Sequence, residues 1–162
     1  TMISKKLEAA INDQIANELW SSNLYLSMSF FCAKEGYSGF AAWLEKQSVE
    51  ERSHASMMAD FVIKRGGTAK VETVKDVPFC WESPLALFRN VYEHECKVSQ
   101  MINNLLKIAK EEADFAAEDF MWQFVREQVQ EEATADDIVT KVEKFGENAL
   151  YDLDSTLGQR QN

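Results

Sequence analysis

The chain has 162 residues, of which 46% are hydrophobic and 27% are charged, and this globular composition excludes a disordered protein. Its 27 acidic and 17 basic residues give a formal net charge of −10. That balance argues against a nucleic-acid-binding protein, which needs a basic surface, and suits a protein that collects cations.

Helical periodicity and the sparse helix breakers predict five helices, at residues 4–34, 38–65, 84–111, 115–145 and 147–157. Ser4 and Asp114 are expected to cap the first and fourth of them, and Gly146 to end the fourth. The segment between residues 66 and 83 is rich in β-branched residues and contains a proline, which predicts an extended connection.

The length of this connection indicates the topology. Its 83 − 66 + 1 = 18 residues can span up to roughly 60 Å when extended, whereas a helix of ~27 residues is only about 40 Å long. The connection can therefore run the whole length of a bundle and make the second and third helices parallel. The short turns make the other sequential neighbours antiparallel. We expect one all-α domain over residues 1–162, a four-helix bundle with a long crossover and a short fifth helix.

The three cysteines, Cys32, Cys80 and Cys96, are widely spaced and odd in number, which disfavours a disulfide framework. The first residues lack the apolar stretch of a signal peptide, and no apolar run approaches membrane length. We therefore expect a cytoplasmic protein.

Each long helix carries a glutamate on its apolar stripe, where an aliphatic side chain is expected. These acids are Glu18, Glu51, Glu95 and Glu131, and His54 and Gln128 share the stripes. With a rise of 1.5 Å per residue, each of the six lies about 23–28 Å from the turn that joins the two helices of its hairpin. All six are therefore expected in one layer of the bundle. A buried unpaired carboxylate costs several kcal/mol, and four at one depth repel one another. A cation is therefore expected between them.

The spacing of these residues repeats. In each helical hairpin an acid is followed, 33 and 36 residues later, by two further polar residues, and the second set lies 77 residues after the first. The sets are Glu18, Glu51 and His54, then Glu95, Gln128 and Glu131. The pattern indicates a pseudo-twofold pair of hairpins, each contributing one residue plus an i, i+3 pair.

Four carboxylates and one imidazole, without a thiolate, suit a hard or borderline metal such as iron or manganese. Glutamate on one helix and Glu-x-x-His on another is the di-iron signature of helical bundles. Glu51 is placed to bridge two metals, and Gln128 to hydrogen-bond with a bound oxygen or water. Tyr25 lies two turns after Glu18, either near the metals or in the core. His94 is one step off its stripe and is taken as a flanking residue.

Several runs of sequence resemble the ferritin family, and the bacterial non-haem ferritins most. They are ANELWSSNLY, the EERSH of residues 50–54, the YEHEC of residues 92–96 and the EQVQEE of residues 127–132. Ferritins are hollow cages of 24 subunits that oxidise Fe(II) at a di-iron ferroxidase centre, using oxygen or hydrogen peroxide, and store Fe(III) as a hydrated oxide mineral. The resemblance implies a ferritin-like fold, ferroxidase activity and self-assembly into a homo-24-mer, without nucleic-acid or membrane partners.

The resemblance also assigns residues to sites. Glu18, Glu51 and His54 would hold the first iron, Glu51, Glu95 and Glu131 the second, with Gln128 and Tyr25 near the centre. Glu50 and Glu127 match two ligands of a third iron site, which is expected to be weak because Gln130 stands where the family commonly has an acid. Haem is not expected, since Arg52 occupies the position of the haem-ligand methionine of bacterioferritins.

Two other functions remain open from the residues alone. One is a helical scaffold whose layer of acids is a relic or binds metal only structurally. The other is a monomeric di-iron oxidase acting on organic substrates. The oxidase is disfavoured because the amphipathic fifth segment has no place in a four-helix core and is expected to pack against other subunits.

Overall fold

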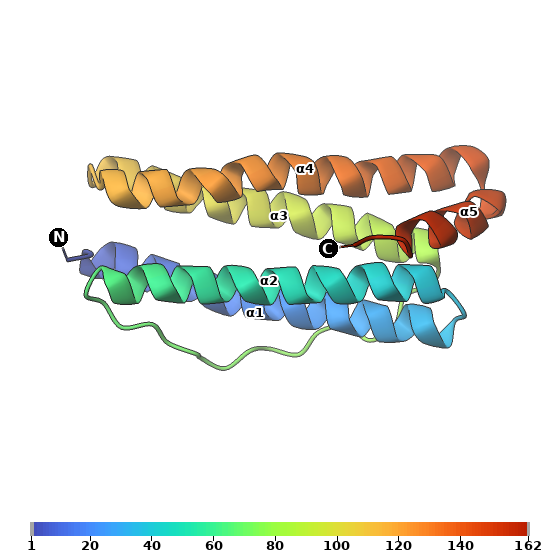
Figure 1. Ribbon diagram of the computed structural model, residues 1–162, viewed down its shortest axis with the longest axis horizontal. Helices are drawn as coiled ribbons and strands as arrows, with labels where there is room; N and C mark the ends of the chain where they lie inside the picture. The colour runs from blue at the N-terminus through green and yellow to red at the C-terminus, as the bar shows by residue number, and fades with distance from the viewer. Residues whose placement is uncertain (1, 162) are drawn as a thin grey trace. The chain divides into compact units, whose positions relative to one another are not determined.

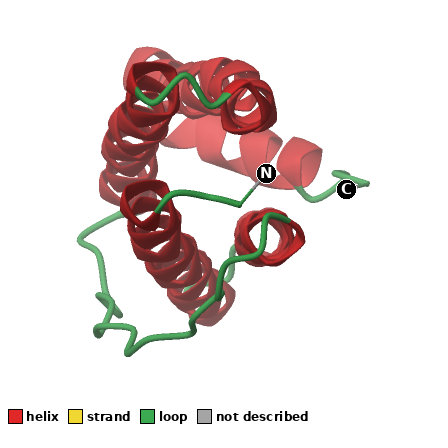
Figure 2. Cartoon of the chain, turned by 90° about the vertical axis from the view of Figure 1, so that its left-hand side faces the viewer, coloured by secondary structure: helices red, strands yellow, loops and turns green. Residues whose placement is uncertain are grey.

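The computed structural model describes residues 2–161, which form five helices joined by loops and include no strand (Figures 1 and 2). The helices are α1 (Lys5–Lys34), α2 (Ser38–Lys64), α3 (Pro84–Glu111), α4 (Phe115–Phe145) and α5 (Glu147–Leu157). All five predicted helices are confirmed, with ends within one residue of those expected. None of the helices described is both long enough and apolar enough to cross a membrane.

Local chemistry explains where these helices begin and end. The Ser4 hydroxyl accepts a hydrogen bond from the Leu7 amide at 3.1 Å, and the Asp114 carboxylate accepts one from the Ala117 amide at 3.1 Å. Both expected N-caps are thus present. Gly146 ends α4 with a φ of 68°, a conformation that is open to glycine at little cost.

The chain divides into two compact units. The first contains the residues up to Pro84 together with those from Glu147 onward, and the second contains Leu85–Gly146. The expected single domain over residues 1–162 therefore stays a prediction.

In the first unit, α1 and α2 form an antiparallel hairpin. The Ser22 and Ser48 hydroxyls each donate to the other residue's carbonyl at 2.7 Å, and the Ser29 hydroxyl donates to the Ala41 carbonyl at 2.7 Å. In both pairs the two residue numbers sum to 70, as expected for one continuous antiparallel register. This register places Glu18 beside the turn of α2 that contains Glu51 and His54.

The long connection follows α1 from one end to the other. Its contacts, in order along α1, are Asn12 Nδ2 to the Thr68 carbonyl at 2.9 Å, Trp20 Nε1 to the Asp76 carbonyl at 3.2 Å, Ser27 Oγ to the Pro78 carbonyl, and the edge-to-face rings of Phe31 and Trp81. The expectation of an extended connection that spans the length of a helix is therefore confirmed (Figure 1).

Helix α5 packs on the start of α2. The Phe40 amide donates to Asp154 Oδ1 at 2.8 Å, and a Cβ atom on Gly39 would lie only 1.7 Å from the Asp154 carbonyl oxygen. Leu150 and Leu153 are buried. Much of the apolar stripe of α5 is thus covered within the chain. The stripe therefore needs a partner subunit less than the sequence indicated, which weakens the argument against a monomer.

In the second unit, α3 and α4 lie side by side and antiparallel. Arg89 Nη2 meets Glu143 Oε1 at 2.9 Å near the start of α3. Further along, Cys96 Sγ and Ser99 Oγ donate to the two oxygens of Glu132 at 3.1 and 2.8 Å. This pairing sets the register that brings Glu95 beside Gln128.

Candidate metal centre

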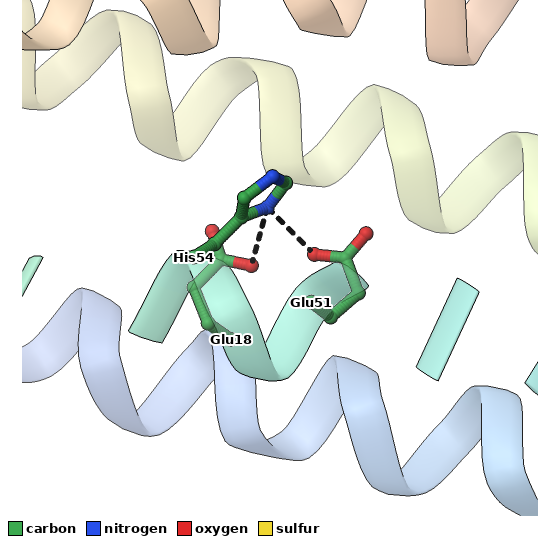
Figure 3. A group of neighbouring side chains, drawn as sticks. All are labelled: Glu18, Glu51 and His54. Carbon is green, nitrogen blue, oxygen red and sulfur yellow. Dashed lines mark ion pairs between the residues drawn. The ribbon is translucent and has the colours of Figure 1, made fainter. Parts of the chain in front are cut away.

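Glu18 from α1 and Glu51 and His54 from α2 form a buried group, which we call the α1–α2 cluster (Figure 3). One potential ligand atom from each residue lies within 4.8 Å of the other two. His54 Nδ1 is 3.8 Å from Glu18 Oε2 and 3.4 Å from Glu51 Oε2. Because Glu51 and His54 are three residues apart on one helix, both side chains leave the same face of α2.

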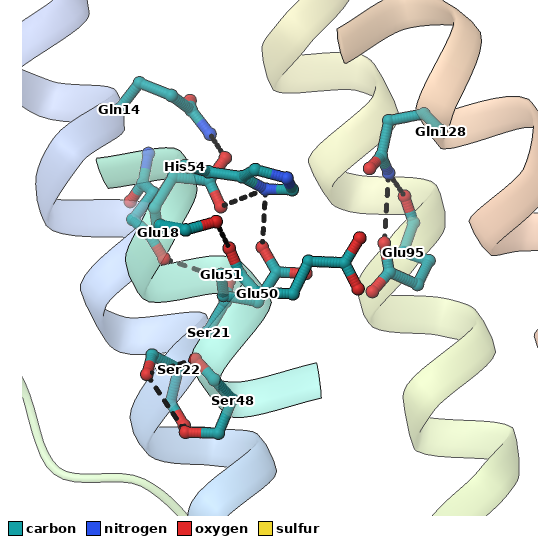
Figure 4. A network of polar contacts seen from close by, with 12 residues as sticks. Gln14, Glu18, Ser21, Ser22, Ser48, Glu50, Glu51, His54, Glu95 and Gln128 are labelled. Carbon is teal, nitrogen blue, oxygen red and sulfur yellow. Dashed lines mark hydrogen bonds and ion pairs between the residues drawn. The ribbon is translucent and has the colours of Figure 1, made fainter. Parts of the chain in front are cut away.

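Only one of the two oxygens of the Glu18 carboxylate accepts a hydrogen bond. Gln14 Nε2 donates to its Oε1 at 3.1 Å (Figure 4), whereas its Oε2 is buried and accepts no hydrogen bond. A buried acceptor without a donor costs about 1–3 kcal/mol, and more for a charged group. The free lone pairs lie among the other possible ligands, where a bound cation would satisfy them.

The electrostatics of the cluster keep Glu18 ionised. Burial raises the pKa of Glu18, but its interactions with His54, Glu51 and Gln14 outweigh burial and hold the pKa below its ordinary value. Glu18 is therefore a carboxylate at neutral pH, which is the form that binds a metal ion.

The second hairpin carries an analogous group, and Figure 4 shows the contacts between Gln128 and Glu95 as dashed lines. Gln128 Nε2 lies 3.0 Å from Glu95 Oε2, 3.1 Å from the Glu95 carbonyl and 3.2 Å from Ser99 Oγ. Glu95 and Gln128 are both buried. Gln128 thus hydrogen-bonds to the buried carboxylate of Glu95, and its role toward a metal stays a prediction.

The remaining predicted site residues are spread over three helices. Tyr25 is fully buried on α1, and Glu131 and Glu127 are half-buried on α4. Glu50 is half-buried on α2 and forms an ion pair with Arg160 at 2.9 Å.

Gln130 and His94 are the other two residues that the sequence singled out near the predicted sites. Gln130 is exposed and donates to Thr134 Oγ1 at 3.2 Å. His94, expected to flank the stripe of Glu95, is buried, with 7% of its surface exposed.

Three polar residues of these sites escaped the sequence analysis. Gln14 lies four residues before Glu18, and Ser99 lies four residues after Glu95, so a search of the adjacent helical turn would have found both. Arg160 lies 110 residues from Glu50 in sequence, and no periodicity connects them.

Two carboxylates and an imidazole, buried together and with one oxygen lacking a donor, have the composition of a site for a hard or borderline divalent cation. Iron, manganese and zinc all accept such ligands. The structure thus defines a candidate metal site in a helical hairpin of an all-α protein.

Comparisons with known proteins define its class. The model of the Ferritin-like domain family matches residues 8–145. A bacterial non-heme ferritin of Bacteroides fragilis (strain 638R) is 56% identical over 159 residues, covering 98% of this chain and 100% of its own. One of Staphylococcus aureus (strain MRSA252) is 34% identical over 161 residues, covering 98% and 97%. The chain therefore belongs to the ferritin family, and iron storage is its function.

Solved structures agree. A novel open-pore ferritin from the hyperthermophilic archaeon Archaeoglobus fulgidus superimposes with a TM-score of 0.96 at 46% identity, covering 98% of this chain and 99% of its own. A humanized archaeal ferritin gives a TM-score of 0.97 at 45% identity, covering 99% of each chain. The predicted fold class, a ferritin-like four-helix bundle with a short C-terminal helix, is confirmed.

Proposed function

We propose that this iron-storage protein is a ferroxidase, which oxidises Fe(II) with oxygen or hydrogen peroxide at a di-iron centre within one chain. The observation that carries the proposal is the α1–α2 cluster, in which the buried Glu18 Oε2 lacks a hydrogen-bond donor beside Glu51 and His54. Leaving this buried oxygen without a hydrogen-bond partner costs free energy, which a bound cation would recover, and ferritin family membership supports iron as the cation.

The centre combines residues of both hairpins. We assign Glu18, Glu51 and His54 to the first iron and Glu51, Glu95 and Glu131 to the second, with Glu51 bridging and Tyr25 nearby. The support is the repeat of 33 and 36 residues in the two hairpins and the burial of both Glu18 and Glu95. Gln128 holds the Glu95 carboxylate by hydrogen bonding. Glu50 and Glu127 are assigned to a third, weaker iron site.

The chemistry of the donor set favours oxidation. Each Fe(II) gives up one electron, so a pair of irons supplies the two electrons that reduce dioxygen to hydrogen peroxide. Carboxylate ligands stabilise the higher charge of Fe(III) more than that of Fe(II), which lowers the reduction potential of the bound iron. Water supplies the oxygen of the ferric oxide and releases protons. The product is stored as a hydrated oxide mineral.

Storage requires an enclosed volume, so we propose self-assembly into a hollow 24-subunit cage. Self-assembly is supported by large apolar side chains that are exposed on the first unit and that a partner subunit would cover. Phe30 on α1 is 65% exposed, and Val71 and Phe79 on the long connection are 84% and 82% exposed. Sedimentation checks the assembly, since a species of monomer size at micromolar concentration would contradict it.

A matched pair of variants tests the activity. Glu51→Gln removes one carboxylate of the centre, whereas Glu93→Gln makes the same change at an exposed position of α3. Stopped-flow absorbance of Fe(III) formation should show at least a tenfold slower initial oxidation in Glu51→Gln and wild-type kinetics in Glu93→Gln. Wild-type kinetics in Glu51→Gln would contradict the assignment.

A titration separates the enzyme from a scaffold that binds metal only structurally. Ferrous iron is added in steps under oxygen, and the Fe(III) formed is counted per chain. A ferroxidase continues to turn over beyond two or three irons per chain, whereas a structural metal site stops at its own occupancy.

A further inference from the structure

The C-terminal residues after α5 turn back along α2, and Arg160 docks on that helix. One nitrogen of its guanidinium, Nη1, donates to the Trp43 carbonyl at 3.3 Å and to Gln47 Oε1. The other, Nη2, donates to Glu50 Oε2 at 2.9 Å. The guanidinium also stacks over the Trp43 ring, 5.2 Å from its centroid. Four contacts thus fix one side chain that is only 20% exposed.

The backbone of this tail is held independently of the guanidinium. Lys46 Nζ donates to the Arg160 carbonyl. A Cβ atom on Gly158 would lie 2.9 Å from the Gly39 Cα, so the end of α5 and the start of α2 touch through two glycines. The position of Arg160 therefore follows from packing as well as from charge.

Arg160 occupies a face of α2 that leads to the candidate metal centre. Trp43, Gln47 and Glu50 follow one another at helical spacing, and His54 is the next residue of that face, one turn beyond Glu50. The last carboxylate before His54 on this face is thus paired with a guanidinium.

We propose that Arg160 is a positioning residue that restricts cation binding at Glu50, so that a divalent cation must displace its guanidinium to use that carboxylate. The Glu50 carboxylate then has its charge neutralised and one of its two oxygens occupied while the tail is docked. The chain would therefore fill the cluster first and the Glu50 site last.

This inference rests on the proposed function in that the α1–α2 cluster and the Glu50 site both bind divalent cations. The test is calorimetric titration of the assembled full-length protein with Co(II), which mimics Fe(II) without being oxidised under the same conditions. We expect Arg160→Ala to leave the tight binding phase unchanged and to strengthen the weakest phase about three- to tenfold. Arg160→Lys, which keeps a positive charge, should restore much of the wild-type value.

Two controls make the result specific. Arg89→Ala removes an arginine from another ion pair, that with Glu143 at 2.9 Å, and should leave all phases unchanged. In a Glu50→Gln background, Arg160→Ala should have no further effect on cation affinity, because the carboxylate that pairs with Arg160 has been removed.

Each failure has a separate meaning. Equal affinities in wild type and Arg160→Ala overturn the role of Arg160, as does an equal gain in Arg89→Ala. A persistent effect in the Glu50→Gln background also overturns it. Absence of Co(II) binding in the wild-type protein would overturn the proposed metal centre itself.

Discussion

Replacing Gly39 with alanine tests how α5 is held on α2. The new Cβ atom would lie 1.7 Å from the Asp154 carbonyl oxygen and 2.6 Å from its carbon, both in the backbone of α5. No rotamer change can relieve contacts with a backbone, so α5 must move. The helix would then lose the bond from the Phe40 amide to Asp154, which is 2.8 Å long.

The cost follows from what the movement breaks. A hydrogen bond to a charged group contributes about 1.5–3 kcal/mol, and full exposure of a buried leucine costs about 1.5–3 kcal/mol. Two leucines of α5, Leu150 and Leu153, are buried. A freed helix regains conformational entropy, which offsets part of this loss. We expect a net destabilisation of about 2–3 kcal/mol, at the upper end of overpacking substitutions, and a melting temperature lower by roughly 5–10 °C.

Hydrogen exchange and thermal unfolding together check this expectation. Gly36→Ala is the matched control, because Gly36 has a φ of 88° and a Cβ atom added there would meet no other atom within 4 Å. It should cost about 1–2 kcal/mol through backbone strain and leave amide protection in residues 147–157 unchanged. Wild-type melting and full protection of those residues in Gly39→Ala would refute the reasoning.

Three further predictions concern single side chains. Because the pKa of Glu18 is lowered in the fold, its ionisation stabilises the protein above the unfolded pKa and ceases to do so as the pH falls through the folded pKa. In urea unfolding, the stability of wild type relative to Glu18→Gln should therefore decline between pH 6 and pH 3, and a rise would contradict the prediction. Burial, with Asp154 and Glu35 nearby, raises the pKa of Cys32 to about 12, so iodoacetamide at pH 8 should modify Cys32 only after unfolding, as mass spectrometry would show. Ser22→Ala removes the 2.7 Å bond to the Ser48 carbonyl and should cost about 1 kcal/mol in chemical denaturation; an unchanged midpoint would show that this bond contributes nothing.

The helices were predictable because their signals are local. Ser4 and Asp114 offer capping side chains, Gly146 stops a helix, and few other breakers interrupt the chain. The pairing of Glu18 with Glu51 and His54 was also predictable, because a fixed rise per residue makes depth in a hairpin a matter of counting.

Other features depend on contacts that no local pattern encodes. The docking of Arg160 on Gln47 joins residues 113 apart, and the close approach at Gly39 depends on where α5 returns. The burial of His94 also escaped prediction, since the width of an apolar stripe depends on what packs against it. Such features follow from tertiary packing, which the periodicity of one helix does not determine.

The most direct test of the di-iron centre is anomalous diffraction from crystals soaked in Fe(II) without oxygen. We predict two well-occupied iron positions in each chain, one bounded by Glu18, Glu51 and His54 and the other by Glu51, Glu95 and Glu131. A third position, at Glu50 and Glu127, should be weakly occupied or empty. Absence of an iron peak within bonding distance of His54 would contradict the assignment of the centre.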